Sequence, residues 1–177
     1  MTPLGHMGIA YLAGIGITKA FPALDVVSVV TTITLGGVAP DLDLLYRYIQ
    51  TGGGNILDKT IGKHRYLPSH TPFFLLSLGA FLTFISLLFS KLSFALPIWF
   101  FVLGTMLHLF LDTLFFPEGV NFLYPFSKKM TTFLTIKTHP FWAPRKISQI
   151  DGWWKNYLRS PIFLVFEIFP TLLAFMV

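Results

Sequence analysis

Residues 94–116 read FALPIWFFVLGTMLHLFLDTLFF, an apolar segment long enough to cross a bilayer as a helix. His108 and Asp112 are the ionisable side chains within it, and their spacing places both on one helix face, about one turn apart. Ionisable groups beside hydrocarbon are costly, so they are usually retained for function. The segment therefore predicts a membrane helix and a site near one of its ends.

The composition extends this membrane character to the whole chain. Of 177 residues, 54% are hydrophobic and 12% charged, whereas a soluble domain carries roughly 25% charged residues. Helices and closed barrels are the structures that satisfy the backbone in lipid, and the apolar segments lack the alternation of barrel strands. We therefore predict an all-α integral membrane protein, a bundle of about four core transmembrane helices plus a C-terminal hydrophobic helix.

Five hydrophobic segments are expected, at about Met7–Phe21, Leu24–Ala39, Pro72–Ser90, Phe94–Phe116 and Pro161–Val177. The first two are glycine-rich, which allows close helix packing, and form a hairpin that turns at Phe21-Pro22. Gly36-Gly37 and Pro40 are expected to break the second helix. The last segment, interrupted by Glu167 and Pro170, either spans the membrane or lies partly in its interface.

The basic residues predict how these segments are oriented. All Lys and Arg residues except Lys19 and Lys91 fall in the stretches 44–69 and 117–160, which a two-helix hairpin separates. Both stretches therefore lie on one side, which the positive-inside rule assigns to the cytoplasm. We expect a multi-pass protein of the cell (inner) membrane. The net charge of +5 suits contact with anionic lipid, and with no recognisable reading module, no nucleic-acid partner is expected.

Imidazole and carboxylate side chains are expected at the cytoplasmic ends of these segments: His6, Asp41, Asp43, His64, His70, His108 and Asp112. Such side chains are the ligands of a borderline or hard divalent metal. The chain has no cysteine, which excludes a thiolate site and a disulfide framework. Because topology and ligands were inferred from different residues, their agreement favours one buried site.

Each short motif also has a purely structural explanation. The His108–Asp112 pair could be a hydrogen bond that stabilises a helix pair. Asp41 could cap the helix that begins near Leu44, which leaves Asp43 unexplained.

The stretch from His64 to His70 places two histidines and Arg65 just before the third segment. The planar guanidinium of Arg65 suits phosphate or carboxylate. Ser69 could cap the third helix. The alternative is a basic interfacial loop that holds no ligand. His139 is expected to be an interfacial residue. Nucleophile-elbow, Walker and His-Glu-x-x-His motifs are all missing from the sequence.

In their order, these motifs resemble those of the YdjM-type membrane-bound metal-dependent hydrolases. The resemblance covers roughly residues 1–130 and rests on His6, Pro40-Asp-Leu-Asp43, His64-Arg…Ser-His70, His108-Leu-Phe-Leu-Asp112 and Phe116-Pro-Glu-Gly-Val-Asn-Phe-Leu-Tyr-Pro-Phe-Ser-Lys128. Tyr66 stands where the family often has glycine, the second loop histidine comes one residue later, and Tyr124 replaces a tryptophan. We expect a single domain over 1–177, in which 131–177 supplies an amphipathic, aromatic loop and the C-terminal helix.

The family is remotely similar to zinc-dependent phospholipase C and P1-nuclease-like enzymes, which implies a helical metal site and phosphoester hydrolysis. Arg65, with Lys63 nearby, would bind the substrate phosphate, and Asp41 or Asp43 would bridge metal ions or act as a base. Carried over by motif, the implied metal ligands are His6, Asp41, Asp43, His64, His70, His108 and Asp112. These exceed the needs of one tetrahedral ion, so one or two divalent ions are expected, Zn²⁺ first and Mn²⁺ or Mg²⁺ as alternatives.

The sequence thus predicts a membrane-bound, metal-dependent hydrolase that cleaves a phosphoester of a lipid or lipid-linked substrate at the cytoplasmic membrane face. One alternative is a non-catalytic membrane protein with a structural metal site, and it predicts that protein ligands fill every coordination position. Another is a divalent-metal transporter, and it predicts polar residues at mid-membrane depth. The glycine-rich helices also permit an oligomer.

Overall fold

The computed structural model describes residues 2–50, 67–115, 119–132 and 163–177. Within these ranges the chain forms helices, turns and an isolated antiparallel bridge between Val120 and Thr131, with no extended strand. The predicted all-helical class is therefore confirmed. The α-helices are α1 (Pro3–Ala20), α2 (Val26–Val38), α3 (Leu42–Gln50), α6 (Pro72–Leu88), α7 (Ala95–Phe115) and α10 (Phe169–Met176).

Capping residues and prolines set where several helices begin. Thr2 is the N-cap of α1, and Pro3 occupies the first helical turn, where the missing N–H of proline costs nothing. Asp25 caps α2, because its carboxylate accepts a hydrogen bond from the backbone N–H of Ser28 at 2.8 Å. Pro72 begins α6 in the same way as Pro3 begins α1. The expected turn between the first two segments is therefore confirmed, with α1 ending at Ala20 and α2 starting at Val26.

The helical path does not break at Pro40. A single 3-10 turn, Ala39–Asp41, joins α2 directly to α3. Pro40 is tolerated there because it lies in the first turn of a new helix, where its absent N–H has no partner to lose. Gly36 and Gly37 lie inside α2. The predicted end of the second helix near Pro40 is therefore confirmed, because α2 ends at Val38, but the glycines do not interrupt it and the chain continues as a 3-10 turn.

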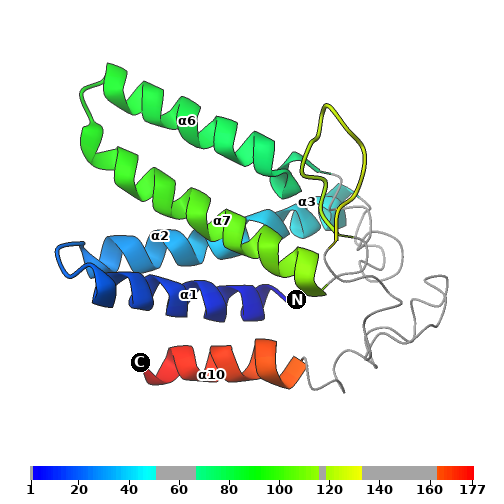
Figure 1. Cartoon of the computed structure of the whole chain (residues 1–177), viewed down its shortest axis with the longest axis horizontal. Coiled ribbons are helices and arrows are strands. Elements are labelled where there is room, and N and C mark those ends of the chain that lie inside the picture. The colour runs from blue at the N-terminus through cyan, green and yellow to red at the C-terminus, as the bar shows by residue number, and fades with distance from the viewer. Residues whose placement is uncertain (1, 51–66, 116–118, 133–162) are drawn as a thin grey trace.

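Helix α2 packs against both α1 and α7, α6 packs against α7, and α10 packs against α1 (Figure 1). At the α2–α7 contact the two backbones touch, because a Cβ added at Gly36 would lie 2.1 Å from the Phe101 carbonyl oxygen. A Cβ at Gly104 of α7 would lie equally close to the Ile33 carbonyl oxygen. Small residues allow this approach in membrane helices, where apolar side chains gain little by leaving lipid.

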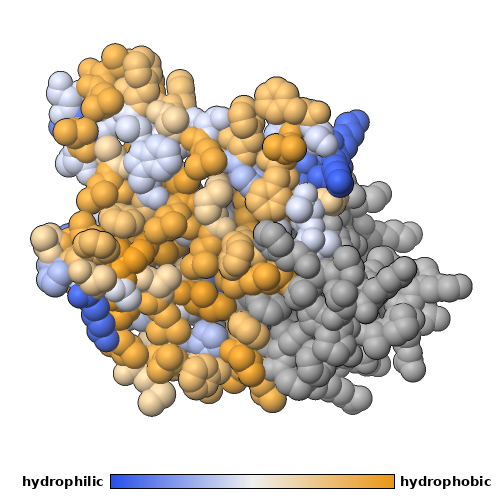
Figure 2. Space-filling model, in the orientation of Figure 1, coloured by the Kyte–Doolittle hydropathy of each residue, from blue (hydrophilic) through white to orange (hydrophobic). Residues whose placement is uncertain are grey.

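Large apolar side chains cover much of the outer surface (Figure 2). Phe81, Phe84 and Leu88 of α6 are each more than half exposed, which suits contact with lipid better than with water. Two helical stretches, Val26–Tyr46 and Leu92–Leu114, are long and apolar enough to cross a membrane. Pro72–Leu88 and Leu164–Met176 are shorter apolar helices.

The helix ends lie at two opposite ends of the molecule. Figure 1 shows the start of α1, helix α3, the start of α6 and the end of α7 together at one end of the molecule. Lys19, in the last turn of α1, and Lys91, between α6 and α7, belong to the opposite ends. The candidate site lies at the first of these two ends.

Candidate metal centre

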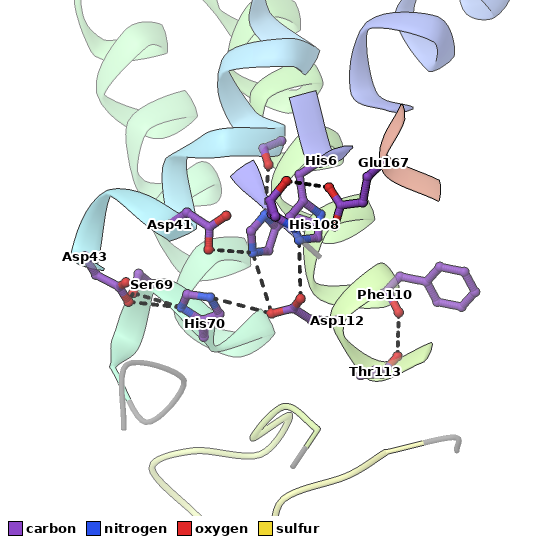
Figure 3. Close-up of polar contacts among 12 residues, drawn as sticks. His6, Asp41, Asp43, Ser69, His70, His108, Phe110, Asp112, Thr113 and Glu167 are labelled. Atoms are coloured by element: carbon purple, nitrogen blue, oxygen red, sulfur yellow. Dashed lines mark hydrogen bonds and ion pairs between the residues drawn. The ribbon is translucent and has the colours of Figure 1, made fainter. Parts of the chain in front are cut away.

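Six of the side chains singled out in the sequence converge at this end of the helices (Figure 3). They come from four parts of the chain: the first turns of α1, the α2–α3 junction, the 3-10 turn Pro68–His70 before α6, and the second half of α7. The six are His6, Asp41, Asp43, His70, His108 and Asp112. Their function as metal ligands stays a prediction, as does that of His64, Arg65 and Lys63, which lie outside the described residues.

Asp112 stands at the middle of the cluster. One carboxylate oxygen, Oδ1, lies 3.3 Å from Nε2 of His6. The other, Oδ2, lies 3.8 Å from Nε2 of His108 and 3.9 Å from Nε2 of His70. Asp112 and the three histidines are almost completely buried, with at most 1% of each side chain exposed. One carboxylate thus faces three imidazoles in a space closed to water.

His108 is oriented by the backbone of α2. Its Nδ1 lies 2.8 Å from the carbonyl oxygen of Gly37, and a carbonyl only accepts, so Nδ1 carries the proton and donates it. That tautomer leaves the lone pair on Nε2, which faces Asp41 Oδ1 at 3.7 Å as well as Asp112. A metal-ligating histidine is usually held in this way by a second hydrogen bond from its other ring nitrogen.

His70 is oriented by Asp43. The Nδ1 atom of His70 lies 3.1 Å from Asp43 Oδ2, and Ser69 Oγ donates to the same oxygen at 2.8 Å. Nε2 of His70 is thereby turned toward Asp112. The prediction that Ser69 caps α6 is wrong, because Thr71 holds that position and its side chain makes no capping bond. Ser69 instead supports the Asp43–His70 pair.

His6 completes the cluster from α1. Its ring stacks on that of His108, with centroids 3.8 Å apart and an interplanar angle of 24°. The ring of His70 meets that of His108 edge-on, with centroids 5.4 Å apart. Stacking of this kind lets two imidazoles reach the same carboxylate from neighbouring helices.

Two groups of three donors within this cluster could hold an ion, and they share His108. One comprises His6, Asp41 and His108, and the other comprises His70, His108 and Asp112, with all donor atoms of a group within 4.8 Å of one another. Bonds of about 2.0–2.2 Å to a four-coordinate ion separate its ligand atoms by about 3.3–3.6 Å. Within the groups, Nε2 of His108 lies 3.7 Å from Asp41 and 3.8 Å from Asp112, and Nε2 of His70 lies 3.9 Å from Asp112, slightly more than that spacing.

The electrostatics of the cluster also suit a cation. Asp41, Asp43 and Asp112 bring three carboxylates into a region where their side chains are at most 8% exposed. Burying carboxylates is costly unless positive charge or hydrogen bonds compensate. A divalent ion supplies that charge, and neutral imidazoles paired with carboxylates suit borderline ions such as Zn²⁺.

Glu167 lies in the π-helical turn Leu164–Ile168 before α10. The sequence marked it only as an interruption of the apolar C-terminal segment. The structure buries its side chain, with 2% exposed, against the start of α1. An isolated acid in an apolar tail is the signal that could have drawn attention to it, because such residues are rarely incidental in membrane segments. The Gly37 carbonyl, which orients His108, has no comparable signal in the sequence that would have identified it.

Apolar helices around a buried His/Asp cluster define a helical membrane protein with a candidate metal centre. The family model described as YdjM inner membrane protein matches residues 1–176, so the chain belongs to the YdjM inner membrane protein family. This confirms the family resemblance drawn from the motifs of residues 1–130 and extends it over nearly the whole chain. No curated protein and no solved structure matches the chain.

Proposed function

We propose that this protein is a membrane-bound, metal-dependent hydrolase that cleaves a phosphoester of a lipid or lipid-linked substrate. The observation that carries the proposal is the convergence of three histidines and three aspartates from four separate parts of the chain. A metal ion that only links two helices needs fewer ligands than these six side chains. A hydrolytic centre needs donors for one or two ions, groups that orient those donors, and an acid or base nearby.

The proposal includes a multi-pass topology of four core helices plus the C-terminal helix, with the His/Asp cluster at the cytoplasmic face. The basic residues support that orientation through the positive-inside rule, because in the sequence all Lys and Arg residues except Lys19 and Lys91 fall in the stretches 44–69 and 117–160. The position of the cluster at helix ends, near headgroup depth, supports a substrate carried by lipid.

Within the cluster, His6, His70, His108, Asp41 and Asp112 would hold the metal, and Zn²⁺ suits them best. When bound, the ion would supply an activated water at neutral pH and polarise the phosphoryl oxygen. Asp43 and the Gly37 carbonyl orient His70 and His108, so that their Nε2 atoms face the cluster. Arg65 and Lys63 remain the candidates for the substrate phosphate on sequence grounds.

The decisive experiment measures metal content by elemental mass spectrometry in protein purified in detergent without chelator. We expect one to two equivalents of Zn²⁺ or Mn²⁺ in the wild type and almost none in His108→Ala and Asp112→Asn. Asp25→Asn is the matched control, because it changes a carboxylate that caps α2 far from the cluster. Metal-loaded protein is then assayed on phospholipids and prenyl phosphates. We expect release of a phosphorylated headgroup or of phosphate by the wild type and by Asp25→Asn, but not by His108→Ala or Asp112→Asn.

The near-complete burial of the cluster favours a second candidate, a structural metal centre without catalysis. Closed coordination would leave no open position for water or substrate. The same two measurements separate the candidates. Bound metal without hydrolysis of any tested phosphoester supports the structural centre, whereas absence of metal, even after titration, contradicts both candidates.

A further inference from the structure

Glu167 is a buried acid that the proposed chemistry does not use. It lies in the turn Leu164–Ile168, next to α10 and far in sequence from the His/Asp cluster. Its carboxylate is nevertheless directed at the first residues of α1, beside His6 (Figure 3). A buried carboxylate among apolar helices is expensive to retain, so its contacts identify what it stabilises.

Both carboxylate oxygens of Glu167 accept hydrogen bonds from Thr2. The backbone N–H of Thr2 donates to Oε1, and the Thr2 hydroxyl donates to Oε2. Thr2 is the N-cap of α1, where free backbone N–H groups and the helix dipole both favour a negative charge. Glu167 therefore binds α1 at its N-terminal end, where a carboxylate stabilises a helix most.

The neighbouring contacts hold α10 against α1. The Thr171 hydroxyl donates to the Glu167 carbonyl at 2.6 Å and approaches the Leu4 carbonyl at 3.3 Å. Gly8 lies against the backbone of α10, where an added Cβ would come within 2.9 Å of the Thr171 nitrogen. The first two turns of α1 thus have a fixed position relative to α10.

His6 depends on this fixed backbone more than the other histidines do. Nδ1 of His6 has no hydrogen-bond partner among the described residues, and its Nε2 faces Asp112, whereas Nδ1 of His108 and of His70 each has an orienting partner. The backbone N–H of His6 bonds to the Thr2 carbonyl at 3.2 Å, which links it to the residue that Glu167 holds. The position of the His6 imidazole is therefore set through the first turn of α1.

We propose that Glu167 is a positioning residue of the metal centre, and that it holds the Thr2 end of α1 so that His6 faces Asp112. The inference rests on the metal centre of the proposed function. It makes the C-terminal segment part of that centre, although none of its residues belongs to either group of donors.

The test is a Co²⁺ titration of the full-length protein in detergent, followed by visible absorption, which reports both affinity and ligand geometry. Glu167→Gln keeps the size of the side chain but presents an amide N–H₂ to a Thr2 donor. We expect about tenfold weaker Co²⁺ binding, the effect typical of losing an orienting partner. Its spectrum should shift toward that of His6→Gln. Asp25→Asn, which weakens a helix cap elsewhere, should leave affinity and spectrum unchanged.

A second pair of variants keeps the inference testable if Glu167→Gln does not fold. Thr2→Val removes the hydroxyl donor and should weaken Co²⁺ binding, and Thr2→Ser, which retains the donor, should restore it. Wild-type affinity and spectrum in a folded Glu167→Gln variant, or equal binding by Thr2→Val and Thr2→Ser, would overturn the inference while the metal centre stands. Absence of Co²⁺ uptake by the wild type would overturn the metal centre itself, and the inference with it.

Discussion

The three histidines of the cluster are fixed by three different means. His108 is held by a backbone carbonyl, His70 by a carboxylate, and His6 by stacking and by the helix that carries it. Each arrangement leaves Nε2 directed at Asp112. The geometry therefore separates side chains that would bind an ion from those that orient them, and it places Asp43 among the latter.

This separation gives a prediction for Asp43. In Asp43→Asn the side-chain shape is kept, but the negative partner of His70 is lost, so we expect metal affinity to fall by about 10- to 100-fold. The number of ions bound at saturation should stay the same, because Asp43 lies outside both donor groups. Isothermal titration with Zn²⁺ in detergent measures both quantities.

Ser69→Ala provides the graded comparison for this experiment. It removes one hydrogen bond to Asp43 and should weaken metal binding less than Asp43→Asn does. A lower number of bound ions in Asp43→Asn would instead make Asp43 a direct ligand, as the sequence first suggested.

Residue types and spacing were sufficient to single out the six side chains that the structure brings together. The i, i+4 spacing of His108 and Asp112 predicted a shared helix face, and both side chains now face the same cluster. The orienting contacts could not be predicted, because the Gly37 carbonyl that holds His108 belongs to another helix and carries no residue-specific signal. The Thr2–Glu167 contact joins the two extremes of the chain and is equally invisible in sequence.

At the scale of helices, glycine positions decide how closely α2 and α7 approach. Gly36 and Gly104 face each other's helix at backbone distance, and this contact sets where His108 meets Gly37. The sequence predicted close packing of glycine-rich helices but not which pair would touch. That choice depends on matching glycines in two segments far apart in the chain.

Gly36→Ala should therefore destabilise the fold. Its Cβ would meet the Phe101 carbonyl, a backbone atom that cannot rotate away, so we expect a loss of about 1–3 kcal/mol in the free energy of unfolding. Gly16→Ala is the matched control, because no atom lies within 4 Å of its added Cβ, and alanine favours helix by up to about 1 kcal/mol. Thermal unfolding in detergent compares the two variants.

If Gly36→Ala unfolded at the wild-type temperature, the α2–α7 contact would not be as close as described.

The helices themselves follow well from the sequence, because hydropathy identifies apolar segments and proline or capping residues mark several of their starts. The continuity through Pro40 was missed because proline is read first as a helix breaker, while its tolerance in a first turn depends on the path the chain takes next.

At the scale of the whole molecule, the helix ends carry a topological prediction. The lack of native cysteines allows single cysteines to be placed at Ser93, between α6 and α7, and at Ser127, in the loop after α7. The positive-inside rule predicts that the cluster end faces the cytoplasm. A membrane-impermeant maleimide should therefore label Ser93→Cys in intact cells and Ser127→Cys only after permeabilisation.

The reverse labelling pattern would place the His/Asp cluster on the outer face and would exclude cytoplasmic substrates. Labelling of both positions in intact cells would contradict a membrane-spanning α7. Lys19→Cys, at the far end of α1, serves as an additional reporter that should match Ser93→Cys.

The dispersal of the cluster along the chain has a consequence for biosynthesis. His6 and Asp41 emerge from the ribosome early, but the first three-donor group is complete only when His108 has been made, and the second only with Asp112. The partner of Thr2 is made later still, because Glu167 follows Asp112 in the chain. On the proposed function, metal loading would therefore follow the synthesis of α7, and His6 would gain its last support only after Glu167 has been made.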